Sequence, residues 1–399
     1  MATDINGAII YLPENKLDNE TKQLVKKFSE SEVFDNVRVM PDCHASSYCC
    51  VGMTCQINNK VIPQIVGGDI GCGISCYNLN KVIKEKQYSK YDDMIKKIVP
   101  MGERNHKVSI TTDEMMEDIY NRCNQKLEIL KNKIPKYPYN DFKYNQNYYK
   151  NLISRAKSNV SSSNYLTSMG TLGGGNHYIE FNQEENGNCY LTVHCGSRHM
   201  GQAICTYHQN KIAKKKGYDK KEFLNNYLED EELVEYLIDM IFAQEFASQN
   251  RAVIIQQICD NIGVEYNRER IIESIHNYID FDRLILRKGA ISAEKGKLCI
   301  ISLNMKDGIL ICKGKGNPEW NYSSAHGCGR LMSRRDARLN FNMKEFHKTM
   351  KDVYSTSVCK ETLDEIPQAY KDVELIKKHI CRSVDIVKQL YPIINIKGY

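Results

Sequence analysis

GGDIGCG, residues 67–73, is the most informative stretch of the chain. It places Asp69 and Cys72 three residues apart in a turn flanked by glycines. Such a turn offers little bulk to a hydrophobic core, but it can direct a carboxylate and a thiolate toward one point. Both groups are metal ligands, so the turn predicts part of a metal site.

Further segments place histidine, aspartate or cysteine at strand ends or in glycine-rich turns. They are MPDCH at 40–44, GTLGGGNHYIE at 170–180, HCGSRHMG at 194–201, SIHNY at 274–278 and SSAHGCGRLMSRRDA at 323–337. A thiolate, a carboxylate and several imidazoles suit Mn, Fe, Co or Zn better than Mg or Ca. Taken singly, a buried histidine is more often a hydrogen-bonded core residue than a metal ligand.

Two common sites are absent from the sequence. There is no Cys-x-x-Cys pair of the kind that structural zinc sites use. GGGN is not followed by Gly-Lys-Ser/Thr, so it is not the loop that holds phosphates in nucleotide hydrolases. The residues alone therefore indicate a metalloenzyme that handles a phosphate.

The composition is that of a globular protein. The 399 residues are 42% hydrophobic and 26% charged, which excludes wholesale disorder. A net charge of +6 permits a polyanionic partner without requiring one. The N-terminus lacks the basic and apolar regions of a secretory leader, and no stretch is apolar enough to span a membrane. We therefore expect a cytoplasmic protein, not membrane-bound, whose sixteen cysteines are reduced.

The hydrophobic pattern predicts one α/β body with central sheets flanked by helices. Strands are expected at 37–40, 52–57, 60–68 and in several runs between 284 and 316. Helices are expected at 19–30, 91–100 and 117–133, at 231–259, which is apolar on several faces, and in the closing text from 343 to 391. No repeat or linker divides the chain, so residues 1–399 are predicted to form a single domain.

One segment differs in character from the rest. Residues 131–157 hold seven basic residues against one acid, interleaved with tyrosines and a phenylalanine. Bases stack on aromatic rings and phosphates attract Lys and Arg, so the segment could be an insertion that contacts RNA. A surface linker whose tyrosines cover the core is the favoured alternative.

Taken in order, these motifs resemble the RtcB family of GTP-dependent RNA-splicing and repair ligases. The matching segments are those quoted above together with RKGAISA at 287–293, AYKDV at 369–373 and IKG at 396–398. The resemblance extends from about residue 38 to residue 398. It implies one large RtcB-like α/β domain.

The resemblance also implies a set of metal ligands. Two Mn²⁺ ions would share Cys72 as a bridging thiolate. Asp69 and His177 would complete one site, and His194 and His276 would complete the other.

A nucleophile and a nucleotide site are implied in the same way. His326 would attack the α-phosphorus of GTP to form a guanylyl-histidine, and Asp42 would orient or deprotonate it. Arg198 and Arg330 would bind RNA or nucleotide phosphates. The expected contacts of the GTP nucleotide are Asn176, Glu180, Asn277, Ser302, Met305, Gly327, Gly329, Tyr370 and Lys397.

The implied reaction joins RNA ends in tRNA splicing or RNA repair. A 2′,3′-cyclic phosphate is opened to a 3′-phosphate, which attacks the guanylyl-histidine to give a guanylylated 3′ end. A 5′-hydroxyl end then displaces GMP. An activating protein partner is compatible with the resemblance but not specified by it.

The chain departs from the family pattern in three places. Ser46, Ser47 and Tyr48 replace glycines after His44, SLNMK at 302–306 replaces PGSMG, and His199 replaces a glycine. We therefore expect a divergent member. Two alternatives stay open: a dimetal phosphoesterase that opens cyclic phosphates without guanylylation, and a non-catalytic RNA-binding protein on the same fold.

Overall fold

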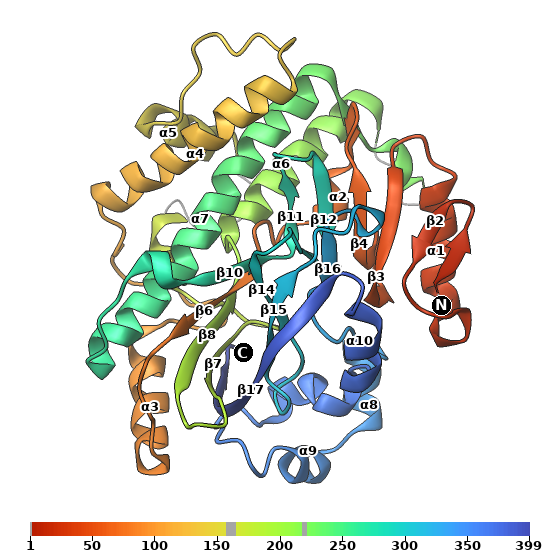
Figure 1. Ribbon diagram of the computed structural model, residues 1–399. Coiled ribbons are helices and arrows are strands. Elements are labelled where there is room, and N and C mark those ends of the chain that lie inside the picture. The colour runs from red at the N-terminus through yellow and green to blue at the C-terminus, as the bar shows by residue number, and fades with distance from the viewer. Residues whose placement is uncertain (1, 157–164, 218–221) are drawn as a thin grey trace.

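A computed structural model describes residues 2–156, 165–217 and 222–399. It is mixed α/β, with two large sheets and helices packed around them (Figure 1). The six-stranded sheet has the strand order β1 (Thr3–Ile5), β2 (Ala8–Ile10), β3 (Asp35–Ala45), β4 (Cys50–Gln56), β12 (Ile285–Lys288) and β11 (Asn277–Asp280). Its neighbours pair antiparallel except for β2 and β3.

The second sheet has seven strands and is nearly closed. Its order is β10 (Ile272–Ile275), β6 (Gly73–Asn78), β8 (Cys189–Cys195), β7 (Tyr178–Gln183), β17 (Val384–Lys397), β15 (Ile309–Gly314) and β14 (Leu298–Ser302). The two end strands meet where the Ile300 amide donates a hydrogen bond of 2.8 Å to the Ser274 hydroxyl. Two short ribbons pair β13 (Ala290–Ser292) with β16 (Ser323–Ala325) and β5 (Lys60–Val61) with β9 (Leu228–Glu229).

The central helix is α7 (Asp230–Ile262), as the apolar run at 231–259 predicted. Acidic residues in its first turn stabilise the helix by their attraction to the positive end of the helix dipole. Gly263 ends the helix in the left-handed conformation. It contacts β6, β8 and β11 on one side and three further helices: α3 (Tyr88–Ile98), α4 (Asp113–Lys133) and α6 (His199–Lys216). It therefore packs against both sheets and contributes to a hydrophobic cluster on each.

The remaining helices lie at the edges of the sheets (Figure 1). The bounds of these helices are α1 (Asn19–Ser29), α2 (Pro63–Val66), α5 (Gln146–Arg155), α8 (Arg334–Asn340), α9 (Met343–Thr349) and α10 (Val373–Ile380). The helices in blue, α8 to α10, lie on the opposite side of the sheets from α4 and α5. Within the described ranges, no helix has the length and apolar character needed to cross a membrane.

Three local expectations were wrong. Residues 60–68 are a strand only at 60–61, because Pro63, which suits a first helical turn, begins α2. The closing text is helical only to Ile380, because 384–397 alternates enough apolar residues to form β17 between β7 and β15. The strand expected to stop before Pro41 continues to Ala45. It can do so because its register with β4 is irregular between Val39 and His44, so the proline disrupts no regular pairing.

The basic and aromatic segment is packed rather than free. Tyr144 and Tyr148 are buried, and their hydroxyls contact Ile238 and Asp239 of α7. Four more aromatic rings, those of Tyr137, Tyr139, Phe142 and Tyr149, pack on the same core. Contact of this segment with RNA stays a prediction, and residues 157–164 lie outside the described ranges.

Candidate active site

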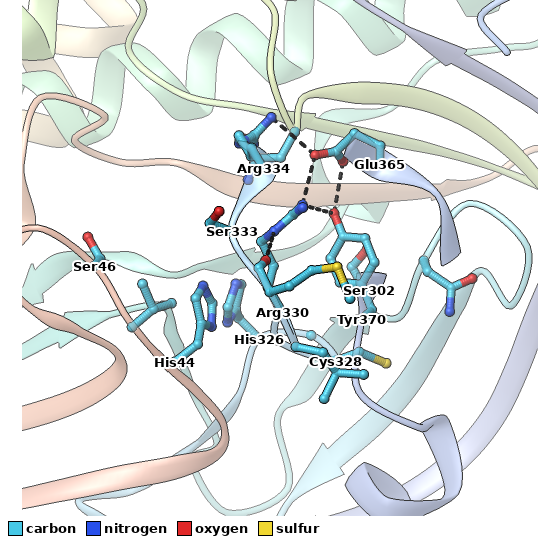
Figure 2. Close-up of a pocket in the computed structure, with 18 of the residues that line it drawn as sticks. His44, Ser46, Ser302, His326, Cys328, Arg330, Ser333, Arg334, Glu365 and Tyr370 are labelled. Atoms are coloured by element: carbon cyan, nitrogen blue, oxygen red, sulfur yellow. Dashed lines mark hydrogen bonds and ion pairs between the residues drawn. The ribbon is translucent and has the colours of Figure 1, made fainter. Parts of the chain in front are cut away.

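A cavity of about 970 Å³ lies where the two sheets meet the C-terminal loops (Figure 2). Its walls come from the end of β3, the start of β7, the loop between β10 and β11, and the segments 302–305 and 326–336. His194, His276 and His326 all line it. Segments distant in the sequence therefore place several imidazoles at one cavity.

Cys72 is the centre of the ligand cluster. Its Sγ lies 3.2 Å from Nε2 of His194 and 3.5 Å from Nε2 of His177. His276 Nε2 lies 3.3 Å from His194 Nε2, and Asp69 Oδ2 lies 3.3 Å from His177 Nε2. The structure thus contains two groups that could each hold a metal ion, Cys72–His194–His276 and Asp69–Cys72–His177, and they share the thiol.

The orientation of the imidazoles suits metal binding. His177 Nδ1 lies 2.8 Å from the Leu172 carbonyl oxygen, and His194 Nδ1 lies 3.1 Å from that of Asn176. A carbonyl only accepts, so each Nδ1 carries a proton, and Nε2, the ring nitrogen that faces Cys72, is the atom available to a metal ion. His276 is held from its backbone, whose amide donates to the Cys72 carbonyl at 2.9 Å.

The electrostatics of the cluster call for a cation. Burial lowers the pKa of His194 and of His276 well below the usual range, so both rings are neutral ligands. Burial, followed by the nearby Asp69 carboxylate, raises the pKa of the Cys72 thiol to about 12. A bound divalent cation would reverse this effect and favour the thiolate. The donor set therefore fits a transition metal.

His326 lies beside this cluster and is held by Asp42. Its ring centroid lies 4.8 Å from that of His276, and its Nδ1 lies 2.6 Å from Asp42 Oδ2. The same carboxylate oxygen accepts hydrogen bonds of 3.1 Å from the amides of His326 and Gly327. The arrangement leaves Nε2 of His326 as its reactive atom.

Gly329 explains why this loop is rich in glycine. It adopts a φ of +68°, and a Cβ at this position would overlap the Asp42 carbonyl oxygen. Any larger residue would therefore push the loop away from Asp42.

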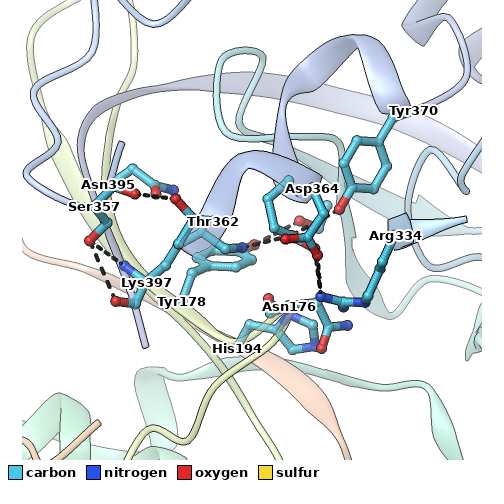
Figure 3. Close-up of polar contacts among 12 residues, drawn as sticks. Asn176, Tyr178, His194, Arg334, Ser357, Thr362, Asp364, Tyr370, Asn395 and Lys397 are labelled. Carbon is cyan, nitrogen blue, oxygen red and sulfur yellow. Dashed lines mark hydrogen bonds and ion pairs between the residues drawn. The ribbon is translucent and has the colours of Figure 1, made fainter. Parts of the chain in front are cut away.

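The expected nucleotide contacts all line the cavity, and several are held by hydrogen bonds, with Lys397 also in an ion pair (Figure 3). Glu365, 3% exposed, receives Lys397 Nζ at 2.8 Å and the Tyr370 hydroxyl at 2.9 Å. Glu180 accepts hydrogen bonds of 2.6 Å from Asn182 and from Asn395, and burial raises its pKa to about 7. This wall is preorganised and carries both donors and acceptors.

The other expected contacts lie around the same wall. Ser302 bonds the Tyr178 hydroxyl at 2.7 Å and forms a bridge with Gly327. Met305 is buried, and the Asn277 side-chain oxygen accepts from the Gly289 amide at 3.1 Å. Asn176 is exposed and lines the cavity.

The two arginines expected to bind phosphates are both engaged in the protein. Arg330 lines the cavity but donates to the Asp364 and Met332 carbonyls and lies 3.4 Å from Glu365. Arg198 donates to Thr171 and to the Gly102 carbonyl, and it is not among the residues that line the cavity. Their role toward phosphates stays a prediction.

The departures from the family pattern have visible structural effects. Tyr48 packs its ring against Phe223, 5.9 Å away. Asn304, within SLNMK, closes its turn by accepting from the amides of Lys306 and Asp307 at 2.9 Å. His199 is the first residue of α6. Ser46, Ser47 and residues 302–305 line the cavity, whereas Tyr48 and His199 are not among the residues that line it.

Sequence reasoning missed several residues that line the cavity. Arg334 lies 2.9 Å from Asp364 and 3.2 Å from Glu365, and its side chain is 45% exposed. Lys288 donates to the Val66 carbonyl at 2.8 Å. Arg334, Lys288 and His44 all line the cavity and all lie within the motifs quoted above, so their position in a motif could have identified them. Glu365 lies in no motif, and only the fold reveals it.

Comparison with known proteins decides the family. A family model described as tRNA-splicing ligase RtcB matches residues 23–398. The chain belongs to the RtcB family. The RtcB resemblance and the single-family α/β fold expected from the motifs are confirmed.

Individual relatives agree over nearly the full length. The RNA-splicing ligase RtcB of Escherichia coli (strain K12) is 28% identical over 402 aligned residues, which cover 94% of this chain and 93% of the relative. The tRNA-splicing ligase RtcB of Nanoarchaeum equitans is 25% identical and covers 92% and 89%. That of Aeropyrum pernix is 26% identical and covers 90% and 87%. The names of these relatives support an RNA ligase.

Proposed function

We propose that this protein is a GTP-dependent RNA ligase that joins 3′-phosphate or 2′,3′-cyclic phosphate ends to 5′-hydroxyl ends in tRNA splicing or RNA repair. The observation that carries the proposal is the position of His326. Its Nδ1 lies 2.6 Å from Asp42, and its ring centroid lies 4.8 Å from that of His276 in the ligand cluster. A hydrolase needs no such carboxylate-held nucleophile.

His326 acts in this proposal as the covalent nucleophile. A neutral imidazole attacks well and, once protonated, leaves well, so it can accept and pass on a guanylyl group. Asp42 keeps the proton on Nδ1 and stabilises the positive charge that develops when Nε2 forms its bond to phosphorus. The 3′-phosphate then takes the guanylyl group, and the 5′-hydroxyl displaces GMP.

The metal ligands would be divided as the geometry divides them. Asp69, Cys72 and His177 would hold one Mn²⁺, and Cys72, His194 and His276 the other. When bound, the two ions would neutralise charge on the reacting phosphates.

The nucleotide would lie against the cavity wall that the expected nucleotide contacts form. Glu180, Tyr370 and Lys397 offer the polar groups for the guanine and ribose, and Ser302, Met305, Asn176, Asn277, Gly327 and Gly329 complete the wall. Arg198 and Arg330 are proposed to act on phosphates, which would require them to exchange their present partners. All sixteen thiols are free, which is consistent with action in the cytoplasm.

The deciding experiment is intact-protein mass after incubation with GTP and Mn²⁺. We expect an adduct of the mass of GMP on the parent protein, none with ATP and none on His326→Ala. A metal-loaded parent that forms no adduct but opens a 2′,3′-cyclic phosphate would instead support the phosphoesterase. The ligand cluster alone is sufficient for that activity.

The shared ligand has its own test in metal content. Cys72→Ala should lose both ions after dialysis, whereas His177→Ala and His194→Ala should each lose one. Equal loss from all three variants would contradict the bridging role of Cys72.

A further inference from the structure

A second imidazole enters the cavity beside His326. His44 lies near the end of β3 and lines the cavity, and Figure 2 shows its ring next to that of His326. Its Nδ1 lies 3.2 Å from the backbone carbonyl oxygen of Asp42. Asp42 therefore holds both rings, His326 through its carboxylate and His44 through its carbonyl.

The second ring nitrogen of His44, Nε2, can act as a base. Because a carbonyl can only accept, Nδ1 carries the proton and Nε2 holds a lone pair. Nε2 has no hydrogen-bond partner among the residues that the structure describes. Burial lowers the pKa of His44 to about 4, and nearby His326 adds to the effect, so the ring is neutral at neutral pH.

The two sides of His326 are chemically different. Ser302 and Tyr370, expected at the nucleotide, lie on one side of His326 in Figure 2, whereas His44 and Ser46 lie on the other. In a phosphoryl transfer the attacking oxygen enters roughly in line with the group that leaves. An alcohol that displaces GMP must therefore approach from the side of His44.

We propose that His44 is the general base of the joining step and takes the proton from the attacking 5′-hydroxyl of the RNA. The bond from O5′ to the 3′-phosphorus forms as the O–H bond breaks and its proton moves to Nε2. The bond between that phosphorus and the GMP oxygen breaks, and GMP leaves with the electron pair. His44 then returns the proton to solvent. This role rests on the ligase function proposed above.

The test separates the joining step from those before it. The parent enzyme, without a 5′-hydroxyl acceptor, can convert a 3′-phosphate RNA into RNA with a guanylylated 3′ end, which is then purified. Three rates are measured for the parent and for His44→Gln. They are GMP transfer to His326, guanylylation of the RNA 3′ end, and joining of the purified RNA to a 5′-hydroxyl RNA.

We expect His44→Gln to affect only the last rate. Glutamine keeps a polar group near the position of Nε2 but cannot accept a proton at neutral pH. Joining at saturating RNA should fall by about 10²-fold or more, with KM unchanged. His347→Gln, at an exposed histidine of α9, is the matched control and should leave all three rates unchanged.

Chemical rescue gives an independent readout. His44→Ala should regain joining when imidazole is added, in proportion to the concentration of its neutral form. Joining by His44→Gln within twofold of the parent, an equal fall in all three rates, or the absence of rescue would each overturn the role of His44. A parent protein that never acquires GMP would overturn the ligase function itself.

Discussion

Two buried aspartate–histidine pairs in this protein have similar separations and different surroundings. In the helical layer, Asp239 Oδ2 of α7 lies 2.8 Å from His208 Nε2 of α6. At the cavity, Asp42 Oδ2 lies 2.6 Å from His326 Nδ1. Both carboxylates are fully buried.

The difference lies in what else each pair contacts. Asp239 also accepts from the Tyr148 hydroxyl at 2.9 Å and from the Arg155 guanidinium, and His208 has no exposed surface. Asp42 keeps one oxygen without a partner among the described residues, and the side chain of His326 is 18% exposed at the cavity. The same chemical pair therefore stabilises the fold where it is enclosed and is available for reaction where it is open.

The largest contrast is expected when each histidine is removed. His326→Ala should abolish ligation, because in the proposed mechanism His326 carries the guanylyl group, and should change the free energy of unfolding little. His208→Ala should do the reverse, with normal GMP transfer per folded molecule. Ligation assays and urea denaturation of both variants provide the measurement. Residual ligation by His326→Ala would remove the catalytic half of the comparison.

Next in size is the cost of opening the enclosed pair. Asp239→Ala leaves Arg155 and His208 without their carboxylate, and breaking such a buried pair costs about 3–5 kcal/mol. The midpoint of urea unfolding should fall accordingly. Asp260→Ala, at an exposed position of the same helix, is the control and should have almost no effect. Equal stability of the two variants would show that the Asp239 network contributes nothing.

A smaller effect concerns acid stability. Burial alone would raise the pKa of Asp239, but the hydrogen bond from His208 and the Arg155 charge lower it to about 2. A carboxyl with a pKa lower in the folded protein than in the unfolded chain stabilises the fold above about pH 4 and loses that contribution as the pH falls toward 2. Asp239→Asn should therefore flatten the dependence of unfolding free energy on pH between these values. An unchanged slope would contradict the assignment.

The smallest effect is expected in the basic and aromatic segment, residues 131–157. Lys143→Glu with Lys150→Glu should raise KM for RNA by about twofold to tenfold if this segment contacts phosphates, and should leave GMP transfer unchanged. Lys344→Glu with Lys348→Glu on α9 is the charge-matched control. Arg155 is unsuitable as a probe, because its pairing with Asp239 would confound RNA binding with stability. An unchanged KM would limit this segment to packing.

Prediction from the sequence succeeded where the signal is local. The run at 231–259 is apolar on several faces, which only a buried helix accommodates, and α7 extends from Asp230 to Ile262. It failed at 384–397, where the identity of a strand depends on the neighbours β7 and β15 that supply its hydrogen bonds. Likewise, the local sequence does not show whether the tyrosines between residues 137 and 149 pack in the core or stack on RNA bases.

The sequence by itself determined the donor types and their order, and through its motifs the family to which the chain belongs. The resemblance already implied that Cys72 meets three imidazoles and that Asp42 acts on His326. Only the tertiary structure gave their distances and decided that Asp42 also holds His44 and that Glu365 receives Lys397. The physical reason is that ligand and hydrogen-bond geometry is set by distances of about 3 Å between atoms. In this chain those atoms come from strands and loops up to 284 residues apart, and the packing of two sheets around α7 brings them together.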